Sequence, residues 1–340
     1  MRDLPTFDKT EIIRIVRRGY GIRVQKIIPY RHIYRLETNL GTLFFKPFHS
    51  KEAKLQLIVK AQEHLKKQGF TRFIPFIPTL NGKPYYCYKK QLFYLTRWID
   101  GHPSNYDNPF ELRKAVHLFA RFHKAAKGFA PPIEIPDFLG KWPLMFKKRT
   151  LELKKCRKNA QKYPRPTPFE NLFFKHIDYY IEQAEKAIEL LDKTDYVLLS
   201  KAGKRELPFC HHDPAHHNIL ITSTNKAFLI DFDYLIRDLH LHDLASLIIR
   251  NGKASTWNLK RCEFLIKAYQ EIKPITPEEF AVIHAFMTYP YDIWLLARAR
   301  YIEKKPWPLT YYIKELIRKT KNEKARQYFL DKFLYSYLLL

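Results

Sequence analysis

The sequence predicts an α+β protein of two lobes: a small N-terminal lobe built on an antiparallel β-sheet with one main helix, and a larger, mainly helical C-terminal lobe. A chain of 340 residues exceeds the usual size of one compact core. Segments rich in β-branched and aromatic residues fill its first hundred positions, whereas helical periodicity dominates after Gly101. The composition changes near residues 98–104, so we expect lobes over residues 1–97 and 98–340.

The N-terminal lobe begins with a short helix over about residues 6–20, predicted from the spacing of apolar side chains and closed by glycine. Extended segments, the second and third joined by a hairpin turn, are expected at residues 24–30, 32–39, 41–48, 84–90 and 91–99. Apolar residues at helical spacing predict a further helix over residues 50–70, after the third strand. Ser50 is its expected N-cap and Gly69 its stop.

The C-terminal lobe shows clear helical periodicity at residues 110–126, 169–191 and 262–272. One region of this lobe reads as extended, residues 209–233. It comprises a polar loop, a strand, a turn at Ser223–Asn225 and a second strand. We therefore expect a single hairpin within an otherwise helical lobe.

Charge is strongly unbalanced, with 60 Lys and Arg against 34 Asp and Glu, a formal net charge of +26. This favours an anionic partner, but no zinc-finger spacing or RNA-binding aromatic motif points to nucleic acid, and a solvated lysine-rich surface accounts for the basic clusters equally well. The four cysteines lie far apart, so neither a zinc site nor a disulfide framework is expected, and a reducing compartment fits. No apolar run has the length of a membrane span.

The stretch FCHHDPAHHNILI, residues 209–221, carries the chemistry. Asp213 is followed five residues later by Asn218, and the predicted hairpin then leads to Asp231 in LIDFDY. In the protein-kinase arrangement, a loop aspartate deprotonates the acceptor hydroxyl, while an asparagine and a second aspartate hold magnesium. Asp213 is the expected base, Asn218 and Asp231 the expected metal ligands, and His211 a brace for the loop.

Two further residues complete this expectation. Lys46 lies in the apolar third strand GTLFFKPF, where a lysine either binds nucleotide phosphates or extends its ammonium to solvent from a sheet edge. Asp243 precedes an apolar helical run, so it either caps that helix or braces the catalytic loop, and we favour bracing.

A zinc metallohydrolase is the rival interpretation of the same loop. Imidazoles and a carboxylate are offered by His211, His212, Asp213, His216 and His217, with His240 and His242 downstream. The alternation of helices and strands typical of such hydrolases is missing, whereas the kinase-order elements are all present. Phosphoryl transfer is therefore the favoured chemistry.

At these residues a family resemblance emerges. HHDPAHHNIL, LIDFDY and HDLA resemble the aminoglycoside phosphotransferase and choline kinase branch of the protein-kinase-like fold. Longer segments, among them LTRWIDGHPSNY, LFARFHKAAKGF and YPYDIWLLARARYIEKKPW, are more closely similar to the spore coat protein S (CotS-like) family. The resemblance extends from about Ile12 to Trp307.

The resemblance implies a kinase-like protein of an endospore-forming bacterium, made in the mother-cell cytoplasm and deposited on the spore coat beside other coat proteins. It implies ATP and Mg²⁺ as cofactors and a hydroxyl acceptor of unknown identity. Asp213 would be the catalytic aspartate, Asn218 and Asp231 the magnesium ligands, and Lys46 the nucleotide lysine. A linker whose backbone faces adenine would be formed by Tyr94, Leu95, Thr96, Arg97 and Trp98.

The sequence departs from the family pattern at two places. The segment IIPYRHIYRL has no glycine to bring backbone amides to the phosphates, so Arg31 and His32 either supply donors instead or belong to a plain exposed hairpin. The helix after the third strand offers Glu52 and Glu63 as partners for Lys46, while the position expected from the register holds Lys60. Two functions remain open, an active phosphotransferase and a non-catalytic, pseudokinase-like assembly component of the coat.

Overall fold

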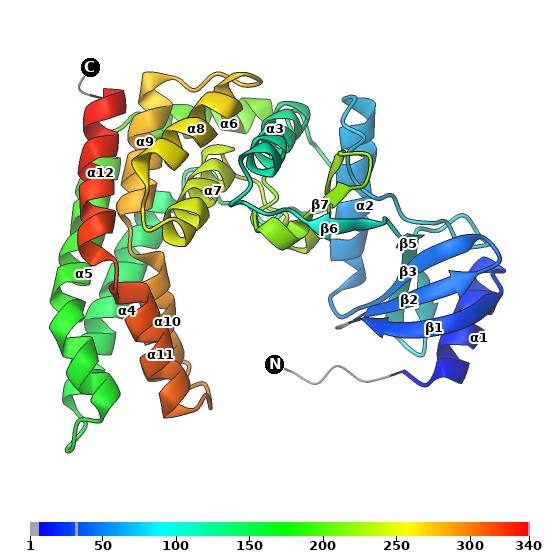
Figure 1. The fold of residues 1–340 in the computed structure, drawn as a ribbon, viewed down its shortest axis with the longest axis horizontal. Coiled ribbons are helices and arrows are strands. Elements are labelled where there is room, and N and C mark those ends of the chain that lie inside the picture. Colours follow the sequence, from blue (N-terminus) through cyan, green and yellow to red (C-terminus); the bar gives the residue numbers. More distant parts are fainter. Residues whose placement is uncertain (1–6, 31–32, 339–340) are drawn as a thin grey trace. The chain divides into compact units, whose positions relative to one another are not determined.

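The computed structural model describes residues 7–30 and 33–338 (Figure 1). Its chain divides into two compact units, one formed by residues up to Ile135 together with His216–Leu235, and the other by Pro136–Ala215 with Ile236 onward. These units are discontinuous in sequence, and the lobe boundary expected near residue 98 stays a prediction. No helix in the described part of the chain combines the length and apolarity that crossing a membrane requires.

The first unit contains a five-stranded antiparallel sheet in the order β1-β2-β3-β5-β4. Its elements are α1 (Lys9–Tyr20), β1 (Val24–Tyr30), β2 (Ile33–Thr38), β3 (Gly41–Phe48), α2 (Glu52–Lys67), β4 (Tyr86–Tyr88) and β5 (Gln91–Arg97). Because side chains alternate along a strand, each strand contributes a separate set of residues to each face of the sheet. One face packs on α1, where Ile12, Val16, Leu43, Phe45 and Leu95 are buried together.

Two details of this unit differ from the expectation. The N-cap of α2 is Lys51, with no side-chain cap bond, so Ser50 does not start this helix. The first helix begins at Lys9, and residue 6 lies outside the described residues. The C-terminal stop is as expected, since α2 ends at Lys67 and Gly69 adopts a φ of +79°.

A second sheet in the same unit has the order β6-β7-β8 and lies beside α3 (Pro109–Ala125). Its strands are β6 (Gly101–Pro103), β7 (Ile219–Thr222) and β8 (Ala227–Leu229). The hairpin β7–β8 matches the sequence prediction, but β6 adds a strand where none was expected. Three residues are too short to show a pattern, and Gly101 fits because a Cβ there would lie 2.7 Å from the backbone oxygen of Ile221.

The second unit is helical. It contains α4 (Trp142–Gln161), α5 (Pro168–Asp192), α6 (Tyr196–Glu206), α7 (Leu241–Ala254), α8 (Leu259–Gln270), α9 (Pro277–Thr288), α10 (Tyr291–Tyr301), α11 (Leu309–Thr320) and α12 (Glu323–Leu338). A buried charge network joins α5 to α10, because Glu170 Oε1 accepts from Arg300 Nε at 2.9 Å and from the Tyr301 hydroxyl at 2.8 Å. This carboxylate is fully buried, so its partners must compensate its charge.

Candidate functional site

The polar loop that precedes Asp213 is held by one buried carboxylate of the second unit. Asp243 Oδ2 accepts the backbone N–H of His211 at 2.8 Å, and Asp243 Oδ1 accepts that of His212 at 2.8 Å. Asp243 is only 1% exposed and lies in the first turn of α7, whose N-cap is His240. Its carboxylate thus binds the backbone of the loop and does not cap its own helix.

Asp213 itself carries an ion pair that the sequence did not indicate. Its Oδ1 lies 2.6 Å from Nη2 of Arg250, which is on α7 two turns beyond Asp243. The Asp213 side chain is 23% exposed and that of Arg250 is 43% exposed, so solvent reaches the pair. Arg250 lies 37 residues away from Asp213, and local sequence patterns give no signal for the contact.

The histidines of this loop pack locally. His212 has a φ of +70° and its ring lies 4.5 Å from that of His242, centroid to centroid. Burial and the neighbouring His242 lower the pKa of His212 to about 4, so the ring is neutral at pH 7. Within residues 7–30 and 33–338, no group of three or more His, Cys, Asp or Glu side chains is arranged to hold a metal ion.

Asn218 belongs to the first unit, in a short 3₁₀ turn over His216–Asn218 that leads into β7. Its backbone oxygen accepts the N–H of Ile230 at 2.9 Å, so Asn218 and the residue before Asp231 are neighbours across the hairpin. Asn218 is 3% exposed. The hairpin therefore brings the two expected metal ligands to one end of this sheet, as the sequence pattern predicts.

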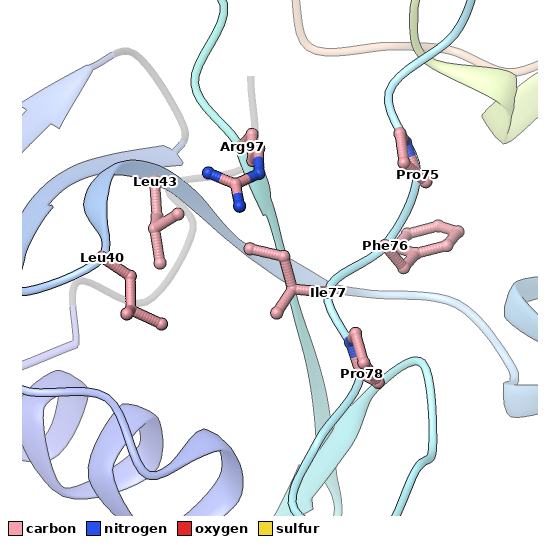
Figure 2. Close-up of a pocket in the computed structure, with 7 residues that line it drawn as sticks. All are labelled: Leu40, Leu43, Pro75, Phe76, Ile77, Pro78 and Arg97. Atoms are coloured by element: carbon pink, nitrogen blue, oxygen red, sulfur yellow. The ribbon is translucent and has the colours of Figure 1, made fainter. Parts of the chain in front are cut away.

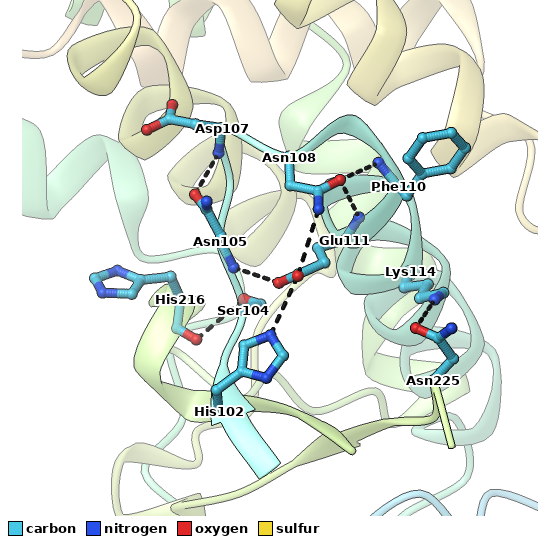
Figure 3. Close-up of polar contacts among 10 residues, drawn as sticks. All are labelled: His102, Ser104, Asn105, Asp107, Asn108, Phe110, Glu111, Lys114, His216 and Asn225. Atoms are coloured by element: carbon cyan, nitrogen blue, oxygen red, sulfur yellow. Dashed lines mark hydrogen bonds and ion pairs between the residues drawn. The ribbon is translucent and has the colours of Figure 1, made fainter. Parts of the chain in front are cut away.

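The polar contacts of Figure 3 hold this turn in place. The Ser104 hydroxyl donates to the His216 backbone oxygen at 3.1 Å, and Ser104 N–H donates to Ile219 oxygen at 2.8 Å. Asn108 caps α3, while Glu111 accepts the Asn105 N–H at 2.7 Å. The segment after β6 thus ties the Asn218 turn to the first turn of α3.

Lys46 lies in β3 and meets two carboxylates from the end of the β7–β8 hairpin. Its Nζ is 2.9 Å from Asp233 Oδ2 and 3.5 Å from Asp231 Oδ1. Burial alone would lower the pKa of Lys46, but Tyr94, Asp233 and Asp231 outweigh that effect and raise the pKa above its ordinary value. The ammonium is therefore charged and held against the carboxylate that the sequence assigned to magnesium.

Asp231 has a backbone conformation that favours a functional interpretation. Its φ of +64° lies in the left-handed region, which non-glycine residues occupy at a cost. Asp233 was not among the expected site residues, although LIDFDY places it two positions after Asp231. The two-residue spacing between Asp231 and Asp233 was the sequence feature that could have indicated Asp233 as a site residue.

The two glutamates considered as partners for Lys46 have other contacts. In the described part of the chain, Glu63 pairs with Lys60 at 2.8 Å, and Glu52 accepts from the Tyr85 hydroxyl and from Gln56. Neither is the partner of Lys46. The role falls to Asp233 and Asp231 because β3 and the 231–233 segment meet directly.

The segment Tyr94–Trp98, expected to be the linker, overlaps the end of β5, which contains Tyr94–Arg97. The Leu95 carbonyl accepts the N–H of Ile77 at 2.8 Å and Trp98 N–H donates to the Thr42 carbonyl at 3.0 Å, so this backbone is already engaged. Tyr94 and Thr96 share the face of Lys46 because they pair with Lys46 and Phe44 across the strands. Leu95 and Arg97 face the opposite side.

That opposite face carries the cavity shown in Figure 2. Its volume is about 270 Å³, and its lining residues are Leu40, Leu43, Pro75, Phe76, Ile77, Pro78 and Arg97. Leu43 also belongs to the core beneath α1. The cavity therefore lies on the α1 side of the sheet, away from the Lys46 ammonium.

The expectation for Arg31 and His32 lies outside the described residues. The strands on either side of them, β1 and β2, pair in antiparallel register, with Tyr30 opposite Ile33. No glycine occurs in either strand.

Comparison with known proteins identifies the family. The family model described as "Spore coat putative kinase YutH" matches residues 13–333. Spore coat protein S of Bacillus subtilis (strain 168) is 25% identical over 306 residues, which cover 89% of this chain and 86% of that protein. Endospore coat-associated protein YutH of the same organism is 19% identical over 293 residues, 85% of this chain and 83% of that protein.

Solved structures share the fold at low sequence identity. An aminoglycoside phosphotransferase from Alicyclobacillus acidocaldarius matches with a TM-score of 0.87 and 22% identity, covering 99% of this chain and 98% of that chain. Spectinomycin phosphotransferase in complex with ADP and its antibiotic matches with a TM-score of 0.62 and 15% identity, covering 96% and 95%. The fold is protein-kinase-like, and since the family model spans most of its length, the chain belongs to the family described as "Spore coat putative kinase YutH".

Proposed function

We propose that this chain is a spore coat-associated phosphotransferase that moves the γ-phosphoryl group of ATP to a hydroxyl acceptor. The observation that carries the proposal is the charged contact of Lys46 with Asp231 and Asp233 at one end of the β7–β8 hairpin. A cation for the phosphates and carboxylates for a metal are what this reaction demands of a protein. The ADP complex of the spectinomycin phosphotransferase, a protein of the same fold, supports a nucleotide as the ligand.

The donor set fits magnesium, which prefers oxygen ligands. Asp231 and Asn218 would hold the ion, with Asp233 beside them, and Lys46 would bind the nucleotide phosphates. Magnesium, when bound, would neutralise charge on the phosphates. From the family resemblance, the backbone of the 94–98 segment would face the adenine. Tyr94 and Thr96 lie on the Lys46 face of β5 and are 9% and 7% exposed.

Asp213 would orient the acceptor hydroxyl and take its proton. The hydroxyl oxygen forms a bond to the γ-phosphorus, the bond from that phosphorus to the bridging oxygen breaks, and ADP leaves with the electron pair. The backbone before Asp213 is held through Asp243, and the Asp213 carboxylate accepts from Arg250. Positioning of this kind is a main source of rate in phosphoryl transfer.

Nucleotide binding is tested by thermal unfolding with and without Mg²⁺ and ATP. A ligand at 100 times its Kd stabilises the folded state by about 2.7 kcal/mol, so a clear rise in Tm is expected for the wild type. Asp231→Asn should abolish the magnesium-dependent part of this rise. Asp8→Asn, an exposed aspartate of the same unit whose side chain makes no cap bond, is the matched control. An unchanged shift in Asp231→Asn removes Asp231 from its assigned role.

The alternative is a non-catalytic component that keeps the fold for assembly of the coat. The absence of glycine from β1 and β2 favours it, because backbone amides then approach phosphates less closely. Asp213→Asn separates the two functions: an enzyme loses phosphate transfer but keeps the nucleotide-induced rise in Tm, whereas a scaffold shows no transfer in either form. The names of the relatives support the spore coat as location. We further propose other coat proteins as partners and synthesis in the mother cell.

A further inference from the structure

The ion pair between Arg250 and Asp213 contributes little to the stability of the loop. Half-exposed pairs of this kind are weak because water screens both charges, and Arg250 is 43% exposed. The loop is already fixed by the two N–H bonds to Asp243. Stabilising the loop therefore does not explain why the Arg250 guanidinium contacts the proposed catalytic carboxylate of Asp213.

Arg250 retains donors for a second ligand. Among the residues that the structure describes, Asp213 is its one hydrogen-bond partner, reached through Nη2 at 2.6 Å. The planar guanidinium carries further N–H groups on Nη1 and Nε, and it suits the oxygens of phosphate and carboxylate. One edge of Arg250 can thus hold Asp213 while another binds an anion.

A second cation lies on the same face of α7. Lys253 follows Arg250 by three residues, the spacing at which helical side chains are neighbours, and it is 40% exposed. Its ion-pair partner is Asp292 at the start of α10. Burial is the main cause that lowers the pKa of Lys253, Asp292 opposes it, and the charges of Lys319 and Arg250 lower it further, so these two cations lie near enough to act on Lys253.

The surrounding side chains add further charges. Lys319 and Arg318 of α11 both contact Glu315 and both lower the pKa of Asp292, whose burial alone would raise it. The group therefore contains four basic side chains, Arg250, Lys253, Arg318 and Lys319, against the three carboxylates of Asp213, Asp292 and Glu315. The basic side chains outnumber the carboxylates by one, which favours an anionic ligand over a cationic one.

We propose that Arg250 and Lys253 form an anion-binding subsite for the acceptor, so that the hydroxyl presented to Asp213 belongs to a molecule that also carries a phosphate or carboxylate group. This inference rests on the proposed function, since it takes Asp213 as the catalytic carboxylate. Arg250 would bridge the base and the anionic group of the acceptor. Its fixed geometry would set the distance between that group and the reacting hydroxyl.

Isothermal titration tests the subsite directly, with inorganic phosphate and acetate as separate probes and Mg²⁺ with AMP-PNP present to occupy the nucleotide site. In Arg250→Gln, the affinity for the preferred probe should fall by about tenfold, the loss expected for one charged hydrogen bond. Arg250→Lys should retain part of it, and Lys201→Gln, an exposed lysine on α6, should match the wild type. The probe that binds more tightly identifies the anionic group.

Equal affinity of both probes for the wild type and Arg250→Gln overturns the inference, including the case in which neither binds. Equal affinities overturn the inference even if Arg250→Gln loses phosphate transfer, because Arg250 would then act only by positioning Asp213. AMP-PNP binding, measured on the same samples, is a separate readout. Its absence from the wild type contradicts the proposed function, while a phosphate affinity that depends on Arg250 would still support the anion subsite.

Discussion

Substitution of Asp243 by Asn tests how the loop before Asp213 is held. The carboxylate accepts two backbone N–H groups at 2.8 Å, and it is 1% exposed. Each hydrogen bond to a charged group contributes about 1.5–3 kcal/mol, and an unsatisfied buried donor costs about as much. Asparagine keeps one acceptor oxygen but turns an NH₂ group toward the other N–H. The substitution Asp243→Asn should therefore lower the free energy that holds the loop by about 2 kcal/mol. Asp243→Ala, which removes both acceptors, should lower it by about 4 kcal/mol.

Hydrogen exchange at the amides of His211 and His212 gives the most direct measurement. A local loss of 2 kcal/mol corresponds to about thirtyfold faster exchange of the amide that has lost its acceptor. Asp195→Asn is the matched control, because Asp195 is exposed in the same unit and makes no side-chain cap bond. Unchanged exchange at both histidine amides in Asp243→Asn would refute the reasoning.

Two further predictions concern charge in the second unit. The pKa of His212 is lowered to about 4, so the protein loses stability as pH falls below the ordinary value of 6.5, and the loss is complete below pH 4. Between pH 7 and pH 5 the free energy of unfolding of the wild type, measured in urea, should fall by about 2 kcal/mol more than that of His212→Asn. Asparagine is the suitable replacement because it tolerates the positive φ and does not titrate. An identical pH dependence of the two proteins would contradict the assignment. Glu170→Gln should cost about 3–5 kcal/mol by leaving Arg300 buried without its counter-charge. Glu185→Gln, in an exposed pair of the same helix, should cost less than about 1 kcal/mol, and equal urea midpoints for the two variants would argue against the buried network.

The sequence predicted those features of the structure that depend on short-range patterns of residues. Asp213, Asn218 and Asp231 are short-range features of one loop and one hairpin, so their spacing alone indicates which of them lie at the same end of a sheet. Helical periodicity likewise located α3, α5 and α8, since each has an apolar stripe long enough to detect.

Contacts between segments that are distant in sequence could not be predicted from such local patterns. The partners of Lys46 are 185 and 187 residues away, and which carboxylate reaches it depends on the packing of β3 against the end of a hairpin. An extended segment was expected over residues 91–99, and its pairing with β3 places the end of the strand at Arg97. Strand β6 forms because β7 supplies a partner, which its own three residues do not reveal.

The choice of partner for Lys46 limits how this protein can be regulated. In kinases whose lysine is oriented by a glutamate from the neighbouring helix, moving that helix switches the enzyme. Here the ammonium is anchored by Asp231 and Asp233, while Glu52 at the start of α2 is engaged with Tyr85. Helix α2 contacts the turn at Phe232–Tyr234, where Lys54 Nζ lies 5.8 Å from the centroid of the Tyr234 ring. A displacement of α2 would therefore reach the lysine through that turn and not through a direct ion pair.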